Sequence, residues 1–118
     1  MTERRLEYAA RFFRRLEDIR ERIAEDNPEA ATRVVLRIRA AIQRLVMSPA
    51  LGRPGRVIGT RELIIPGTPY IVPYRITGDI VQIITVLHSA QHSVIDVGLE
   101  ISGRGGNPER DRPYARRA

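Results

Sequence analysis

The spacing of apolar residues near the start of the chain predicts a short strand followed by an amphipathic helix. RRLEY, residues 4 to 8, is a candidate strand. Between Phe12 and Ile23 apolar residues recur at spacings of four, three and four, while charged residues fill the positions between them. Such spacing places the apolar residues on one face of a helix. We therefore expect a helix over about residues 9 to 25.

The segment Asp-Asn-Pro at 26 to 28 is expected to end this helix and to begin a second one. A proline disfavours helical geometry at the residue before it, so Pro28 ends the first helix near Asn27. Asn27 can also cap the following helix, and Pro28 suits a first helical position. A second apolar stripe then runs from residue 31 to about Met47. A link this short predicts an antiparallel helix hairpin.

Three strands are expected in the second half of the chain, at residues 57–65, 69–76 and 79–88. PGTP separates the first two and TGD the last two, and both sequences are typical of turns. Pro73 cannot donate a hydrogen bond to a neighbouring strand, so it predicts an edge or a bulge. The third strand has apolar residues at both parities, which predicts a central strand covered on both faces.

These elements predict a two-layer α+β domain with the order β-α-α-β-β-β, in which an antiparallel helix hairpin packs on an antiparallel β-meander beside an N-terminal strand. The 118 residues are enough for one such domain. We assign it to residues 1–92. Residues 93–118 form a C-terminal extension that is basic and predicted to be largely disordered.

The formal net charge of +6 arises from 20 basic and 14 acidic residues, and every basic residue is arginine. Residues 102–118 hold five arginines against Glu109 and Asp111, which is about half of the excess. A charge of this size suggests an anionic partner, either a nucleic acid or an acidic protein.

The residue types present limit the possible chemistry. The chain has no cysteine, so disulfides, thiolate catalysis and cysteine-containing zinc sites are excluded. His88 and His92 are four residues apart but have no evident further ligand, so we expect neither a metal nor another cofactor. No apolar run reaches the roughly 18 residues of a membrane span. We therefore expect a protein of the cytoplasm with no membrane partner.

Three stretches, taken in order, carry a resemblance to a known family. They are LEDIRERIAEDNPEAA (16–31), LVMSPALGRPGRVIGTRELIIPGTPYIVPYR (45–75) and VQIITVLHSAQ (81–91). Together they resemble the RelE/ParE superfamily of toxins from bacterial type II toxin-antitoxin modules. The resemblance covers roughly residues 4–92 and implies the same two-layer fold.

The superfamily has two branches with different chemistry. RelE-like toxins cut ribosome-bound messenger RNA, and a characteristic catalytic arginine lies near the start of their middle strand. Ile71 occupies that position here, while Glu62 and Ile64 stand where RelE-like enzymes often carry basic residues. The resemblance therefore favours the ParE-like branch, whose members poison DNA gyrase. It implies a growth-inhibiting toxin of a plasmid-stabilisation type of module, without enzymatic activity of its own.

The resemblance also implies partners: DNA gyrase as the target and a cognate acidic antitoxin, possible in one hetero-oligomer. One alternative is a metal-independent messenger-RNA endonuclease, acting on the ribosome through His88, Arg61 and Arg75, because a positioned base and a cation are what such cleavage needs. A degenerate, non-toxic binding module is the other alternative.

The candidate contact residues for the target or the antitoxin are Arg61, Glu62, Tyr74, Arg75 and His88. Arg61 and Glu62 should point to opposite faces of their strand, whereas Arg61 and Arg75 on neighbouring strands are expected to face a partner together. Two bland interpretations stand beside these. Tyr74 shares a strand face with Tyr70, as core residues often do, and His88 suits a strand-end histidine bonded to the backbone.

Overall fold

The structure is a computed structural model that describes residues 4–90. The chain begins with strand β1 (Arg5–Tyr8) and continues through helices α1 (Ala10–Asp26) and α2 (Pro28–Gln43). Two 3-10 turns, η1 (Arg44–Val46) and η2 (Pro49–Leu51), lead to the remaining strands. These are β2 (Arg53–Pro54), β3 (Arg61–Ile64), β4 (Tyr70–Thr77), β5 (Ile80–Ile83) and β6 (Leu87–His88). The predicted α+β order is confirmed, with the short β2 added.

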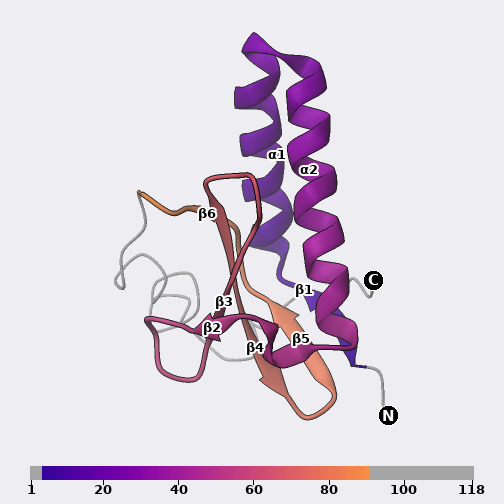
Figure 1. Ribbon diagram of the computed structural model, residues 1–118, viewed down its shortest axis with the longest axis vertical. Coiled ribbons are helices and arrows are strands. Elements are labelled where there is room, and N and C mark those ends of the chain that lie inside the picture. The colour runs from indigo at the N-terminus through magenta and orange to yellow at the C-terminus, as the bar shows by residue number, and fades with distance from the viewer. Residues whose placement is uncertain (1–3, 91–118) are drawn as a thin grey trace.

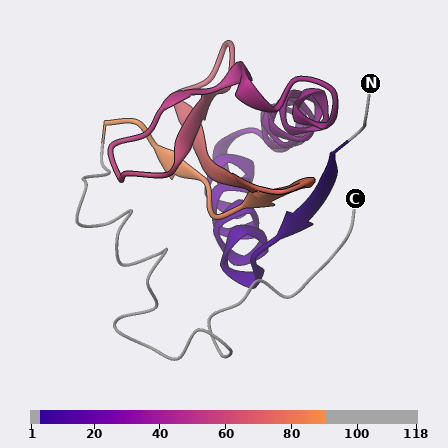
Figure 2. The same ribbon diagram turned by 90° about the horizontal axis from the view of Figure 1, so that it is seen from below.

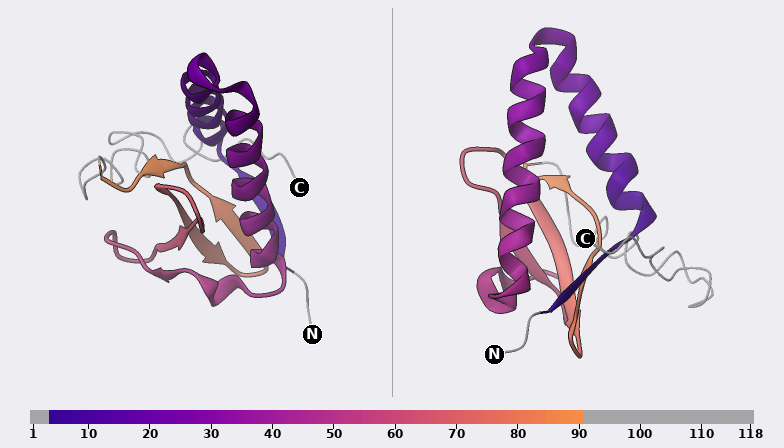
Figure 3. Two further views of the ribbon diagram at one scale, coloured as in Figure 1. Left: turned by 45° about the horizontal axis from the view of Figure 1, so that its top comes forward. Right: turned by 90° about the vertical axis from the view of Figure 1, so that its right-hand side faces the viewer.

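Both helices lie against one side of the sheet, and the tip of their hairpin extends beyond it (Figures 1 and 3). Asn27 is extended, with φ −156° and ψ 93°, so α1 ends there. Its side chain accepts a hydrogen bond from the Ala30 N–H at 3.0 Å, which caps α2. The predicted use of Asn27 and Pro28 as stop and start is confirmed. No helix among the described residues is long and apolar enough to cross a membrane.

The sheet is mixed, with strand order β1-β5-β4-β3-β2. β1 pairs with β5 in parallel, and every other pairing is antiparallel. The core lies between this sheet and the helices. Its most deeply buried apolar side chains come from both layers, among them Phe12, Ile38, Ile42, Leu45, Val72 and Ile83.

The third predicted strand is interrupted by a bulge. Tyr74 pairs with Ile83 in β5, whereas Tyr70 pairs with His88 in β6, so one extra residue lies on the side of β5 and β6. A one-residue shift exchanges the two faces of a strand. The apolar residues at both parities therefore arise from the bulge. β5 is central, as predicted, but Ile80 and Gln82 on its second face are partly exposed, so the expected cover on both faces is wrong there.

Pro73 lies in β4, which has neighbours on both sides, and not at an edge. The Pro73 carbonyl accepts a hydrogen bond from the Ile84 N–H at 3.0 Å, within the interrupted stretch between β5 and β6. The nitrogen of a strand residue points the same way as its carbonyl, so the missing N–H of Pro73 faces the bulge. Of the two predicted settings for Pro73, the bulge is confirmed.

Candidate functional site

The strands present two faces, and the pairing register assigns each candidate residue to one of them. Arg61 pairs with Tyr74 and Glu62 with Pro73, so Arg61 and Glu62 point to opposite faces, as predicted. Tyr74 belongs to the core cluster beneath the helices. We call its side of the sheet the helix-facing side and the other side the outer face. Arg75, next to Tyr74 in β4, is on the outer face.

A buried carboxylate holds the short strand β2 against β3. The Glu62 side chain is 1% exposed. Its Oε1 accepts hydrogen bonds from Arg53 Nε at 3.2 Å and Nη2 at 3.1 Å. Its Oε2 accepts one from the Arg56 backbone N–H at 3.2 Å, and Arg56 Nε lies 3.9 Å away. Glu62 is therefore fully used in binding the β2–β3 connection, and its predicted role as a direct contact residue conflicts with its burial.

Apolar side chains occupy the next part of the outer face. Ile71 and Leu87, paired across β4 and β6, form a small buried cluster with Val57 packed against it from the β2–β3 connection. Figure 2 shows this connection at the end of the molecule away from α2. The place where the RelE-like resemblance would put a catalytic arginine is thus a dry contact between strand and loop.

On the helix-facing side, Tyr74 and Arg61 fasten η2 to the sheet. The Tyr74 hydroxyl donates to the Pro49 carbonyl at 2.7 Å and accepts from the Gly52 N–H at 2.8 Å. Arg61 Nη1 donates to the Gly52 carbonyl at 2.6 Å and to the Ala50 carbonyl at 3.4 Å. Tyr74 is fully buried, so the core interpretation of this residue is confirmed and it cannot be a surface anchor.

Burial raises the pKa of the Tyr74 phenol above its ordinary value of 10.0, against the hydrogen bond from Gly52 and the charge of Arg61, which both lower it. The pKa of Tyr8 is also raised by burial, against the charge of Arg39. Both phenols therefore stay protonated well above neutral pH, and Tyr74 keeps its donor hydrogen.

Arg75 Nε donates to the side-chain oxygen of Gln82, its partner across β4 and β5, at 2.9 Å. This bond holds the guanidinium on the outer face. Arg61 lies on the helix-facing side, so the expectation that Arg61 and Arg75 face one partner together is wrong. The register decides this outcome, because Arg61 pairs with Tyr74 and the residue after Tyr74 points the other way.

His88 lies at the far end of β4 from these arginines. Its ring stands edge-on to the Tyr70 ring with centroids 5.6 Å apart, and its Nδ1 accepts from the Ala90 N–H at 3.2 Å. The bland interpretation of a strand-end histidine bonded to the backbone is therefore confirmed in kind, with an N–H as the partner. Tyr70 and Tyr74 are four residues apart in β4, roughly 13 Å at strand spacing, so His88, Arg61 and Arg75 do not converge on one phosphate.

No cluster of three potential metal ligands occurs among residues 4–90. His92, the other histidine considered for a metal, lies outside the described residues, as does the predicted extension at 93–118.

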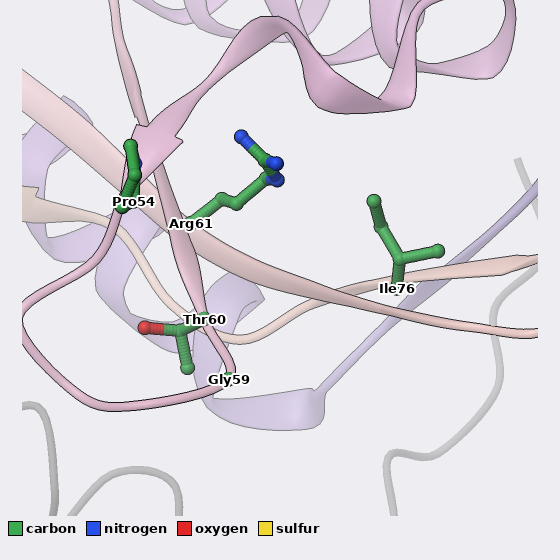
Figure 4. A pocket seen from close by; sticks show the side chains of 5 residues that line it. All are labelled: Pro54, Gly59, Thr60, Arg61 and Ile76. Carbon is green, nitrogen blue, oxygen red and sulfur yellow. The ribbon is translucent and has the colours of Figure 1, made fainter.

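A hollow of about 260 Å³ opens at the side of Arg61. Its walls come from β2, the β2–β3 connection and the end of β4 (Figure 4). The Arg61 side chain extends across it, between Pro54 and Ile76. The lining residues are Pro54, Gly59, Thr60, Arg61 and Ile76.

Arg53 and Arg56 are the residues that sequence reasoning missed, because residues 50–60 were taken as a plain connection. The missed signal is a hairpin, in which Gly55 and Gly59 flank a turn and oppositely charged residues stand at its two ends. Arg53 pairs directly with Glu62, and the Gly55 N–H bonds to the Thr60 carbonyl at 2.8 Å. Opposite charges across a strand pair are a recognised stabilising arrangement.

Comparison with known proteins agrees with this architecture. Residues 6–92 match the family model described as the ParE toxin of the type II toxin-antitoxin system parDE. The protein Y4kP of Sinorhizobium fredii, named as a candidate toxin, is 48% identical over 91 residues, which span 77% of this chain and 94% of Y4kP.

Two solved structures share the fold. A chain of the chromosomal ParDE system of Pseudomonas aeruginosa, written P. aeruginosa in its title, has a TM-score of 0.65 at 26% identity, covering 75% of this chain and 96% of the other. A chain of the toxin-antitoxin complex RelBE2 of Mycobacterium tuberculosis has a TM-score of 0.53 at 24% identity, covering 74% and 99%. The likeness to the second shows the fold alone. By its sequence match, the chain belongs to the ParE family of type II toxins, within the RelE/ParE superfamily.

Proposed function

We propose that this toxin inhibits growth in the cytoplasm by binding DNA gyrase, and that a cognate acidic antitoxin neutralises it. The observation that carries the proposal is the state of the outer face. Glu62 is enclosed by Arg53 and Arg56, and Ile71 is packed under Val57. Cleavage of RNA needs a cation beside the phosphate and a base near the 2′-hydroxyl, in reach of one another. The outer face offers an apolar contact there instead.

The rest of the outer face has the character of a protein-binding surface. Ile64 in β3 is 52% exposed, and Ile58 in the β2–β3 connection is 99% exposed. The guanidinium groups of Arg53 and Arg56 are held near them by Glu62, and that of Arg75 by Gln82. Arginine and apolar side chains are typical anchors of protein interfaces. We call Arg53, Arg56, Ile58, Ile64 and Arg75 the outer-face surface and assign target binding to it.

This assignment revises the contact residues expected from sequence. Arg75 remains a proposed direct contact. Glu62 and Tyr74 act as positioning residues, because both side chains are buried. Arg61 lies on the other side of the sheet and His88 beyond the far end of the arginine pair, so neither belongs to the outer-face surface.

An antitoxin partner is supported by the titles of the two structural relatives, a ParDE system and a toxin-antitoxin complex. The net charge of +6 favours an acidic partner by simple attraction. Absence of a small acidic protein encoded beside this one would contradict this part of the proposal.

Two assays of the purified chain separate gyrase binding from RNA cleavage. We expect inhibition of gyrase supercoiling at stoichiometric toxin, relieved by the antitoxin. We expect no cleavage of messenger RNA on ribosomes. RNA cleavage that is lost in His88→Ala, with supercoiling untouched, would overturn the proposal in favour of the endonuclease. Normal growth on expression without the antitoxin would favour the non-toxic binding module.

We also propose that residues 1–92 are the toxin domain and residues 93–118 an extension of it. The support is that the family match ends at residue 92 and that the core cluster runs from Leu6 to Val86. A chain ending at residue 92 should keep the melting temperature of the full chain. A large loss of cooperative unfolding would show that the extension is part of the domain.

A further inference from the structure

Arg61 is a half-buried cation whose charge no carboxylate compensates. Its Nη1 is committed to the carbonyls of Gly52 and Ala50. Its Nε and Nη2 have no hydrogen-bond or ion-pair partner among residues 4–90. The adjacent carboxylate, Glu62, points to the opposite face and is engaged by Arg53. Charged groups withdrawn from water are normally paired, so unused donors at this position are unusual.

These donors belong to the residue that crosses the hollow of about 260 Å³ (Figure 4). Pro54 and Ile76 give the hollow apolar walls, and no acidic residue lines it. Nη1 fixes the guanidinium in place through two backbone carbonyls, so little side-chain freedom remains to be lost when an anion binds. A fixed guanidinium with free N–H groups suits a carboxylate, which can accept two parallel hydrogen bonds.

We propose that this hollow receives an acidic side chain of the antitoxin, with its carboxylate on Arg61 and its aliphatic part against Ile76 and Pro54. The inference rests on the proposed function for the identity of the partner. The chemistry of the hollow itself does not depend on that function. Charge complementarity decides the occupant, because the hollow presents an unpaired cation in a chain of net charge +6 and excludes a basic segment.

The first test uses butyrate as the probe, because it carries one carboxylate on a short aliphatic stem. In an NMR titration of the full chain, butyrate should shift the backbone amides of Gly59 and Thr60 and the Nε–H of Arg61, and the shifts should saturate. Butyramide, which is neutral, should leave these signals unchanged. Shifts that are absent with butyrate, or equal with butyramide, would overturn the proposal.

Substitutions at the hollow make this test specific. Arg61→Gln removes the cation and should abolish the saturable shifts. Ile76→Glu leaves Arg61 in place but brings a carboxylate to the wall, where it should occupy the guanidinium and block the probe. Ile76 is 37% exposed, so this variant is expected to fold even if Arg61→Gln does not. Ile76→Gln and Arg75→Gln are the matched controls and should keep the shifts. Butyrate binding that persists in Ile76→Glu would contradict the site.

The second test measures the affinity of the acidic protein encoded beside the toxin. Ile76→Glu should weaken this complex at least about tenfold relative to Ile76→Gln, as expected for loss of a charge-assisted pair at an interface. Equal affinities would overturn the antitoxin as the occupant. A chain that binds butyrate but no acidic neighbour would contradict the proposed function and the occupant, while the hollow would stand as a carboxylate site.

Discussion

Arg53 and Glu62 face each other across β2 and β3, and the half-exposed guanidinium of Arg53 forms two hydrogen bonds to one oxygen of the buried Glu62 carboxylate. The same carboxylate accepts the Arg56 N–H through its other oxygen. A two-residue strand has few backbone bonds of its own. This ion pair therefore fixes the β2–β3 connection on the outer face, where we place target binding.

Arg53→Ala should destabilise the domain, because it leaves the Glu62 carboxylate buried with fewer partners. We expect a loss of about 1–3 kcal/mol in the free energy of unfolding, measured by urea denaturation, with the half exposure of Arg53 keeping the loss in this range. Arg20→Ala is the control, because it breaks an exposed pair with Glu17 on α1 and should change stability little. Equal effects of the two substitutions would contradict the role of Glu62.

Tyr74→Phe removes both hydrogen bonds of the buried hydroxyl and leaves the Pro49 carbonyl and the Gly52 N–H unpaired. The expected loss of stability is about 1–3 kcal/mol. Tyr70→Phe is a matched control in the same strand, since no hydrogen bond of the Tyr70 hydroxyl occurs within residues 4–90. Thermal or urea unfolding of the pair decides the matter: a Tyr70→Phe loss as large as that of Tyr74→Phe would refute the clasp.

Alkaline pH should destabilise the domain through its buried phenols. The pKa values of Tyr74 and Tyr8 are raised by burial in the folded state. Below about pH 10 these phenols are protonated in both states, so they add no pH dependence there. Above that pH the unfolded chain loses protons first, and stability falls. The chain has no lysine or cysteine, so few other side chains titrate in this range.

The measurement is urea unfolding from about pH 8 to about pH 11, compared between the wild-type chain and Tyr74→Phe. The variant starts from lower stability but should lose less of it as the pH rises. An identical alkaline decline in both chains would mean that Tyr74 contributes nothing to it.

Thr85 lies in the bulge between β5 and β6, fully buried, and its hydroxyl has no hydrogen-bond partner. Thr85→Val replaces the hydroxyl with a methyl group of similar size. We expect unchanged or increased stability, by up to about 1 kcal/mol, because an unsatisfied buried group is removed. Thr60→Val is the contrasting control, since the Thr60 hydroxyl donates to the Val57 carbonyl at 2.6 Å and its loss should be destabilising. Destabilisation by Thr85→Val would reveal a partner for that hydroxyl.

Charge reversal on the outer-face surface should weaken target binding without unfolding the protein. Arg75→Glu is expected to reduce gyrase affinity by about tenfold or more, as for truncation of an interface anchor, and to relieve growth inhibition. Arg14→Glu, a reversal at an exposed position of α1, should leave both readouts unchanged. Full toxicity of Arg75→Glu, at an unchanged melting temperature, would remove Arg75 from the proposed surface.

Much of the fold follows from local sequence. The apolar spacing between Phe12 and Ile23 specifies a helix because the turn of a helix sets that period. Asn27 and Pro28 end one helix and begin the next through backbone geometry that needs no distant partner. The β2–β3 hairpin was missed because strand β2 has two residues, too few to show a period.

The site depended on contacts that the sequence does not specify. Alternation along β3 was enough to separate Arg61 from Glu62, since neighbouring residues of any strand point to opposite faces. The relation of Arg61 to Arg75 required the register of β3 against β4. That register places Arg61 opposite Tyr74, closed by a turn in which the Ile65 N–H bonds to the Tyr70 carbonyl at 3.1 Å.

The sequence by itself therefore determined the two helices, their junction, the strand order and the family, because these depend on residues close together in the chain. Tertiary structure alone decided that Glu62 is buried beneath Arg53, that Tyr74 holds η2, and that Arg61 and Arg75 look out from opposite faces. A side chain's burial and partners depend on which distant strand lies beside it, and a shift of one residue in that pairing reverses every face.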